Sequence, residues 1–264
     1  MSSRASKLRV LDYAGSVNFP VWLTVGGWTI HPHLFFELLG YAVGGVIFLA
    51  LRKRQGDHIR TPDRWSVVTA AVLGAAAGSR LLFWMEDPAA TAGYWLNAPE
   101  MLGGKTLVGA LLGGWIAVEL TKRWIGVRVS TGDLFVLPLA AGIAVGRVGC
   151  FLSGLADGTY GSPTTLPWGI DLGDGIPRHP TALYESAFMI LFGAFLFRLA
   201  PRLERGRLFT VFIAGYLAFR LAIDFIKPGA TMALGLTAIQ LACVVGLVIC
   251  ARRLRRPATS PVPA

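Results

Sequence analysis

Seven long apolar segments, each a candidate to cross a lipid bilayer, dominate this sequence. A membrane-spanning helix needs about 20 predominantly apolar residues, because the hydrocarbon core of a bilayer is about 30 Å thick. The segments lie near residues 33–51, 66–85, 106–121, 133–152, 180–199, 208–226 and 233–251. The third is short and rich in glycine, which is compatible with a tilted, broken or partly interfacial helix. We therefore predict an all-α, polytopic membrane protein with seven transmembrane helices.

The overall composition agrees with this prediction and argues against a soluble protein. The chain is 54% hydrophobic and only 15% charged, whereas about a quarter of the residues in soluble globular domains are charged. The net charge of +10 could indicate a nucleic-acid partner, but the basic residues lie in short clusters between apolar segments, not in one patch. Such clusters are typical of polytopic membrane proteins, so no nucleic-acid partner is predicted. We expect one membrane domain over residues 1–264.

The basic residues also predict the orientation of the chain, because loops on the cytoplasmic side carry an excess of lysine and arginine. The connections that are rich in these residues are 52–64, 122–128, 198–207 and 252–264. This places the tail 252–264 in the cytoplasm and the N-terminal segment 1–32 outside, which requires an odd number of spans. Residues 1–20 lack a continuous apolar core, so we expect no cleavable signal peptide.

Two long connections, 86–105 and 153–179, are then predicted to lie on the extracytoplasmic side. In the second, Gly173-Asp174-Gly175 separates two short segments, 168–172 and 176–179. An Asp-Gly pair between such segments is a hairpin signal. We therefore expect a small β-hairpin, part of an extracytoplasmic cap over the helix ends.

Arginines inside apolar segments are the strongest functional signal, because a charge in the membrane is costly and usually serves a function. Arg147 and Arg220 both lie toward the outward half of their segments. The planar guanidinium matches a phosphate group and stays charged in poor solvent, so we predict that both bind a phospholipid headgroup. The alternative is structural neutralisation by a buried carboxylate, which Asp224 could supply from the same helix face as Arg220. Arg80 is a third such arginine, which can bind a headgroup or simply extend toward the interface.

Glycines recur around Arg147, at Gly142, Gly146, Gly149 and Gly154. Small residues four apart allow close helix packing in membranes, and the absence of side chains also leaves room for a headgroup against the backbone. Packing alone accounts for Gly142, whereas Gly146, Gly149 and Gly154 are predicted to line the headgroup site. Gly158, beyond the helix end, is included in that site and is expected to shape the loop.

Two histidines precede the first apolar segment, and an acid follows one turn into it. His31 and His33, with Glu37 nearby, could deprotonate a thiol or hydroxyl nucleophile, because a histidine titrates near neutral pH. The alternative is an interfacial hydrogen-bonded cluster. A metal site is also conceivable, but two histidines and one glutamate from one short segment are a weak signal, so no metal or other cofactor is predicted.

A second cluster of polar residues, His179, Tyr184 and Glu185, opens the fifth apolar segment. Glu185 lies deepest and should require a cationic partner, because an unpaired charge is costly to bury. Arg147 or Arg220 is the expected partner. We assign all three polar residues, and Asp224, to the substrate site.

The three cysteines, Cys150, Cys243 and Cys250, have no metal-ligand spacing and lie in or beside apolar segments. This placement does not suggest a disulfide framework. We expect them to be small buried apolar residues.

Several of these residues together resemble the signature of the prolipoprotein diacylglyceryl transferase family. The signature covers Gly146-Arg147-Val148-Gly149-Cys150-Phe151-Leu152-Ser153-Gly154 with Gly158, and Arg178-His179-Pro180 with Leu183-Tyr184-Glu185. It continues in Arg220-x-x-x-Asp224-x-x-Lys227-Pro228, while Arg80 and the stretch from Gly103-Gly104 to Gly113-Gly114 fall in the expected order. The resemblance covers roughly residues 30 to 250.

The resemblance implies a bacterial inner-membrane enzyme that transfers the diacylglyceryl group of phosphatidylglycerol to the lipobox cysteine of a prolipoprotein and releases glycerol phosphate. Arg147 would hold the headgroup, and Arg220 would stabilise the leaving phosphate, since departing negative charge needs positive charge aimed at it. Asp224 and Glu185 would orient the arginines. The implied partners are phosphatidylglycerol, a prolipoprotein signal peptide and surrounding membrane lipids.

The chain departs from the family pattern at three places. Val108 stands where the family has a histidine, Leu155 where it often has a polar residue, and His31-Pro32-His33-Leu34 where it has His-Trp-Tyr-Gly. Since valine cannot transfer a proton, His31 or His33 is predicted to take that role, with Arg220 as the other catalytic residue. The alternatives are a transferase with a different acceptor and a non-catalytic protein that binds or translocates phospholipids.

Overall fold

The structure is a computed structural model and describes residues 19–25, 27–57, 59–94 and 104–255. Most of the predicted N-terminal segment and of the C-terminal tail therefore lies outside the described residues, as does Gly103. The prediction of a single membrane domain concerns the whole chain and stays a prediction.

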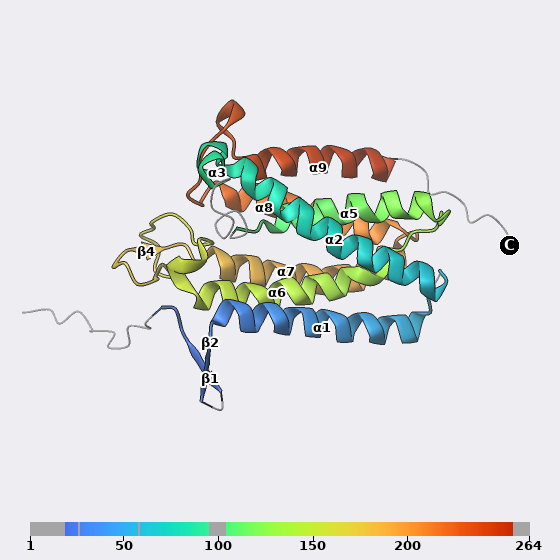
Figure 1. Cartoon of the computed structure of the whole chain (residues 1–264), viewed down its shortest axis with the longest axis horizontal. Helices are drawn as coiled ribbons and strands as arrows, with labels where there is room; N and C mark the ends of the chain where they lie inside the picture. Colours follow the sequence, from blue (N-terminus) through green and yellow to red (C-terminus); the bar gives the residue numbers. More distant parts are fainter. Residues whose placement is uncertain (1–18, 26, 58, 95–103, 256–264) are drawn as a thin grey trace, which may run out of the picture.

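Within the described part of the chain, a long helix occupies each of the seven apolar segments, so the all-α prediction is confirmed (Figure 1). The seven are α1 (Pro32–Gln55), α2 (Thr61–Glu86), α5 (Leu107–Trp124), α6 (Val136–Leu152), α7 (Thr181–Leu199), α8 (Arg207–Asp224) and α9 (Ala238–Arg255). The glycine-rich third segment forms one continuous helix, α5, which excludes the broken helix among its three alternatives. Its glycines are instead used for packing.

Four of the helical segments are long and apolar enough to cross a membrane by length and composition: Pro32–Gln55, Thr61–Glu86, Asp133–Leu152 and Thr181–Arg202. Helices α5, α8 and α9 are shorter and carry charged residues inside or near their ends, such as Glu119, Arg220 and Arg252. The chain is thus a membrane protein by its helices. Seven spans stay a prediction.

Glycines bring two pairs of helices into backbone contact, α1 with α6 and α2 with α5. A Cβ atom at Gly40 would lie 2.7 Å from the carbonyl oxygen of Gly142, and one at Gly78 only 2.4 Å from that of Gly109. Only glycine permits helix axes this close, which is the usual role of small residues between membrane helices. The packing role predicted for Gly142 is confirmed.

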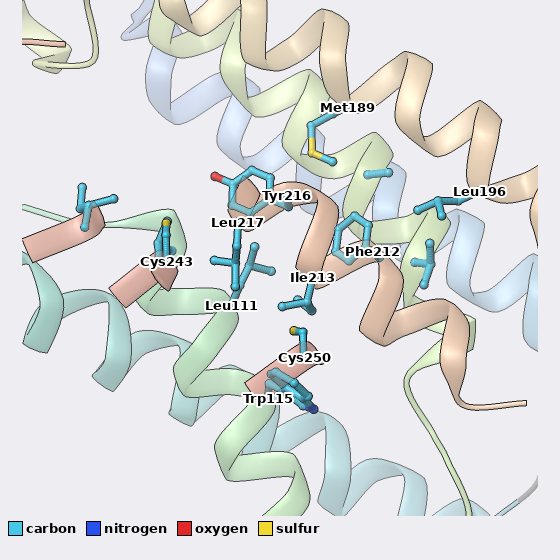
Figure 2. Close-up of a cluster of buried hydrophobic side chains, with 14 of the residues drawn as sticks. Leu111, Trp115, Met189, Leu196, Phe212, Ile213, Tyr216, Leu217, Cys243 and Cys250 are labelled. Carbon is cyan, nitrogen blue, oxygen red and sulfur yellow. The ribbon is translucent and has the colours of Figure 1, made fainter. Parts of the chain in front are cut away.

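Helix α8 runs through the core of the bundle, and Figure 2 shows its side chains between those of α7 and those of α5 and α9. Fully buried side chains of α8 are Phe212, Ile213, Tyr216 and Leu217. Cys243 and Cys250 of α9 are free thiols buried in this same core, as the sequence predicts. Polar groups on the buried face of α8 therefore lie inside the protein.

A cap of short elements lies at the end of the bundle where α1 and α7 begin (Figure 1). It contains α3 (Pro88–Tyr94), the 3₁₀ turn η2 (Gly154–Asp157), and two antiparallel hairpins, β1 (Leu23–Val25) with β2 (Trp28–Ile30) and β3 (Ile170–Asp171) with β4 (Pro177–Arg178). The carboxylate of Asp171 accepts backbone N–H groups of Gly173, Asp174 and Gly175 and closes the turn. The β3–β4 hairpin was predicted; β1–β2 was not.

Three further 3₁₀ turns connect or precede long helices: η1 (Asp133–Phe135), η3 (Ala200–Arg202) and η4 (Ala233–Gly235). Because α6 and α8 both end at the capped end and α7 and α9 both begin there (Figure 1), residues from four helices can meet at this end.

Candidate active site

Arg147, near the end of α6, faces the buried carboxylate of Glu185 on α7. Arg147 Nε lies 2.9 Å from Glu185 Oε2, an ion-pair contact in which the N–H does not point along a hydrogen bond. Glu185 is only 2% exposed, and its other oxygen accepts a hydrogen bond of 2.6 Å from the Tyr216 hydroxyl. The structure thus supplies the cationic partner that the sequence required for Glu185.

Arg220, on the buried face of α8, forms the local ion pair that its spacing from Asp224 predicts. Its Nη2 lies 3.1 Å from Asp224 Oδ1, and Asp224 Oδ2 accepts a 2.6 Å hydrogen bond from Thr237. The second terminal nitrogen, Nη1, is buried and has no hydrogen-bond partner among the described residues. A buried donor without a partner is costly, so this nitrogen is available to an anionic ligand.

Lys227 adds a third positive group just beyond α8. Burial lowers the pKa of Lys227, and the charges of Arg220 and Arg147 lower it further, to about 7, against the opposite effect of Glu185 and Asp224. Because both arginines affect it, Lys227 belongs to the same charged centre as Arg147 and Arg220. An anion bound there would favour its protonated form.

Three members of this centre received no role from the sequence analysis: Tyr216, Thr237 and Glu86. Tyr216 lies one helical turn before Arg220 and therefore shares its face, which is a signal that the sequence does contain. Glu86, at the end of α2, is within electrostatic reach of Arg220 and Asp224, and its Oε1 is buried without a partner in the described part of the chain. Thr237 precedes α9, and its place beside Asp224 follows only from the packing of α9 on α8.

A second polar group adjoins Arg147 through Cys150. Arg147 Nη1 donates a 3.5 Å hydrogen bond to Cys150 Sγ, which lies 3.9 Å from His33 Nδ1. The same Nδ1 is 2.5 Å from Asp157 Oδ1 at the end of η2. Cys150 is therefore buried, as predicted, but its thiol faces polar groups.

The charge state of Asp157 follows from its contacts. Burial raises the pKa of Asp157, but hydrogen bonds from His33 and Thr159 outweigh this effect and hold it below its usual range. The carboxylate is therefore ionised at neutral pH and can hold a cation or a protonated histidine.

Glu37 supports His33 from the other side of the ring. Its Oε2 lies 3.5 Å from His33 Nε2, while Lys105 and Tyr41 donate hydrogen bonds of 3.0 Å and 2.7 Å to its Oε1. His31, the other histidine proposed as a base, lies at the N-cap of α1 with its ring edge-on to Trp22 at 5.2 Å. Of the two, His33 is the one beside the Arg147 centre.

His179 and Tyr184 lie in the cap. His179 Nδ1 is 3.3 Å from the Tyr184 hydroxyl, which accepts a 2.7 Å hydrogen bond from Trp168 Nε1. These contacts fasten the β3–β4 hairpin region to the start of α7. Glu185, the deepest of the three polar residues at the start of α7, instead pairs with Arg147, one of its two expected partners.

Arg80 and Val108 both belong to the α2–α5 contact. Arg80 Nη1 donates a 2.7 Å hydrogen bond to the carbonyl of Gly104, just before α5. Val108 is 1% exposed and packs in the apolar core. The position at which the family has a histidine is therefore apolar and closed to a polar substrate group.

The predicted headgroup glycines differ in what surrounds them. A Cβ at Gly146 would meet nothing within 4 Å, so there is open space beside Arg147. Gly149 packs against Phe36, where a Cβ would lie 2.6 Å away, and Gly154 packs against Phe19 at φ +61°. Gly158, at φ +66°, meets nothing and shapes the turn, as predicted. Close packing accounts for Gly149 and Gly154 without a ligand.

Comparison with known proteins gives one consistent result. A sequence model of the family described as prolipoprotein diacylglyceryl transferase matches residues 20–254. Among similar proteins is the phosphatidylglycerol–prolipoprotein diacylglyceryl transferase of Bordetella avium, 32% identical over 79% of this chain and 81% of the relative. Proteins of the same name from Cupriavidus metallidurans and Dehalococcoides mccartyi are 33% and 30% identical over 77% and 88% of this chain, and over 79% and 90% of their own lengths.

The matched region contains the seven long helices, the centre formed by Arg147 and Arg220, and the adjoining polar group around Cys150. The match extends to within a few residues of either end of the described chain. The chain belongs to the prolipoprotein diacylglyceryl transferase family.

Proposed function

We propose that this protein transfers the diacylglyceryl group of phosphatidylglycerol to an acceptor thiol, the lipobox cysteine of a prolipoprotein. The observation that carries the proposal is the buried centre of Arg147 and Arg220, each paired with an acid, with Arg220 Nη1 left without a partner. The relatives named above have this activity in their names. Phosphatidylglycerol offers an anionic phosphodiester that suits such a centre.

The reaction exchanges a carbon–oxygen bond for a carbon–sulfur bond. The acceptor thiolate attacks the glyceryl carbon, the bond from that carbon to the phosphate oxygen breaks, and glycerol phosphate leaves with the electron pair. Negative charge then develops on the departing phosphate, where Arg220 and Arg147 stabilise it. Glu185 and Asp224 hold the two guanidinium groups in place, so little reorganisation is needed during the reaction.

We infer that all seven long helices cross the membrane, with the cap outside and the C-terminus in the cytoplasm. The last turns of α1, α5 and α9 carry basic residues, and all three helices end opposite the cap (Figure 1). Positive residues favour the cytoplasmic side. The Arg147 centre then lies at the level of the outer leaflet, from which it receives phosphatidylglycerol, and the acceptor is a signal peptide anchored in the same membrane.

A second candidate function is phospholipid binding without transfer. The buried, apolar Val108 favours it, because this side chain cannot replace the histidine that the family has at its position. The two candidates share the lipid site and differ in whether a thiol acceptor is modified.

The test uses purified protein in phosphatidylglycerol vesicles with a lipobox peptide, and measures glycerol phosphate release and peptide mass. Arg220→Ala should lower the transfer rate about 100-fold or more, as loss of one donor to a transition-state anion does elsewhere. Arg207→Ala is the matched control, because it removes an arginine from the other end of α8 that pairs with Glu204 at the surface.

Full activity in Arg220→Ala would contradict the proposed role of the centre. Lipid binding by the wild type without peptide modification would replace transfer by the second candidate function.

A further inference from the structure

Three potential metal ligands from distant parts of the chain meet beside Arg147. His33 lies at the start of α1, Cys150 near the end of α6 and Asp157 at the end of η2. Their ligand atoms lie within 4.8 Å of one another. More than a hundred residues of sequence separate His33 from the other two, so the cluster is a product of the tertiary fold.

The three potential ligands converge on one side of the His33 ring. Both Cys150 Sγ and Asp157 Oδ1 approach the same nitrogen, Nδ1, at 3.9 Å and 2.5 Å. Three ligand atoms that converge on one point are the arrangement that a bound cation requires.

The opposite nitrogen has the partner expected of a metal-bound histidine. A ligating histidine usually directs its other ring nitrogen to a carboxylate or carbonyl, which fixes the ring and its tautomer. His33 Nε2 faces Glu37 Oε2 at 3.5 Å, and Glu37 is itself held by Lys105 and Tyr41. The outer contacts of the cluster are therefore already in place.

Charge and exposure also fit a divalent ion. A thiolate and a carboxylate together supply two negative charges, which a divalent cation balances. The Cys150 residue and the Asp157 side chain are each only 8% exposed, whereas the His33 side chain is 34% exposed. The cluster is thus closed on the protein side and open beside the histidine.

We propose that His33, Cys150 and Asp157 bind a zinc-class divalent metal ion, and that its open fourth position takes the acceptor thiol of the proposed reaction. Sulfur, imidazole and carboxylate are all zinc ligands, and catalytic zinc sites combine three protein ligands with one open position. The role of the metal in transfer rests on the proposed function.

Such an ion would make the acceptor thiol lose its proton, a step for which Val108 provides no base. Coordination to the metal removes the proton of a thiol outright, so the acceptor sulfur becomes a thiolate, its proton passes to water, and no histidine base is needed. The metal-bound thiolate then forms the carbon–sulfur bond while glycerol phosphate leaves toward the arginines. Arg147, which contacts both Cys150 and Glu185, joins the two halves of the site.

Metal binding requires one local adjustment. Zinc bonds of about 2.0 Å to nitrogen and oxygen and about 2.3 Å to sulfur, in tetrahedral geometry, separate the ligand atoms by more than three ångströms. The His33–Asp157 contact must therefore open, while the His33–Cys150 distance already suffices. Asp157 ends a short turn followed by Gly158 at φ +66°, a junction that can accommodate this shift.

The first test measures metal binding directly, on the full chain in detergent. The wild type should hold about one zinc ion per chain and, after exchange, bind Co²⁺ with a thiolate-to-cobalt charge-transfer band. Cys150→Ser should remove that band and weaken Co²⁺ binding at least tenfold, and His33→Ala should weaken binding as much. Cys243→Ser is the matched control, because Cys243 is a buried free thiol in the α9 core away from the cluster.

Absence of stoichiometric metal, or a cobalt spectrum that Cys150→Ser leaves unchanged, overturns the site. Phosphatidylglycerol binding by each variant reports folding independently, since Arg147 and Arg220 remain.

The second test separates this inference from the proposed function. Chelated, metal-free protein should still bind phosphatidylglycerol but transfer at least tenfold more slowly, and added Zn²⁺ should restore the rate. Undiminished transfer by metal-free protein overturns the metal inference while the proposed function stands. Stoichiometric metal binding through Cys150 without any peptide modification overturns the proposed function while the metal site stands.

Discussion

At the scale of single residues, the site depends on charges that the interior has neutralised in pairs. Glu185 is held by Arg147 and Tyr216, and Asp224 by Arg220 and Thr237. Removing one partner of a buried pair leaves an uncompensated buried charge. The resulting loss of stability is much larger than the net stability that the intact pair contributes. Lys227 differs from these paired groups, because burial and the positive charges of Arg220 and Arg147 lower its pKa to about 7.

Lys227 should make phosphatidylglycerol binding pH-dependent. Burial and the two arginines lower its pKa to about 7 in the lipid-free protein, and an anionic headgroup favours the protonated form. Binding then takes up a proton above pH 7, so affinity is full below that pH and falls by up to about tenfold per unit above it. Isothermal titration between pH 6 and 9 should show this fall in the wild type and a flatter profile in Lys227→Met.

The control for this experiment is Lys53→Met, which removes a lysine from the last turn of α1 at the opposite end of the bundle. A profile equally steep in Lys227→Met and in the wild type would assign the pH dependence to another group.

At the scale of helices, glycine contacts set the distances on which the site depends. The α2–α5 pair brings Glu86 toward the arginine centre, and the α1–α6 pair brings His33 toward Cys150. In both pairs a side chain in place of glycine would meet the backbone of the facing helix.

Gly78→Ala tests this dependence. The added Cβ would lie 2.4 Å from the carbonyl oxygen of Gly109, so the helices must separate, at a cost of about 1–3 kcal/mol for overpacking. We expect a lower midpoint of thermal unfolding in detergent and a slower transfer reaction. Gly45→Ala is the matched control on α1: its Cβ would meet nothing within 4 Å, and alanine favours the helix by up to about 1 kcal/mol. Equal stability of the two variants would show that the α2–α5 contact tolerates a wider spacing.

At the scale of the whole molecule, the two ends of the bundle differ in chemistry. Both hairpins and the polar groups around Arg147 lie at one end, and the basic last turns of α1, α5 and α9 lie at the other (Figure 1). With the orientation proposed above, an outer-leaflet lipid and a translocated signal peptide would meet at the capped end.

Thiol labelling in intact cells tests that orientation. A cysteine at the exposed Thr165 in the cap should react with a membrane-impermeant reagent in intact cells, and one at the exposed Arg205 between α7 and α8 only after permeabilisation. The wild-type chain reports background, because its three cysteines are buried. The reverse labelling pattern would invert the proposed topology.

The sequence by itself determined the features that depend on neighbours along the chain. Apolar length predicted seven helices, Asp-Gly predicted the β3–β4 turn, and a spacing of four residues predicted the Arg220–Asp224 pair. Each of these depends only on residues close together in the sequence, through the helical period or the geometry of a tight turn. Motif resemblance likewise identified the family.

Only the tertiary structure decided which distant residues meet. It chose Arg147 as the partner of Glu185, brought the Tyr216 hydroxyl of α8 to the other oxygen of Glu185, and set His33 and Asp157 around Cys150. These contacts depend on helix spacing and rotation, which glycine packing fixes between segments far apart in sequence. Cys150 shows the difference most clearly: its apolar flanks predicted burial correctly, but its polar neighbours His33 and Asp157 come from helix α1 and turn η2.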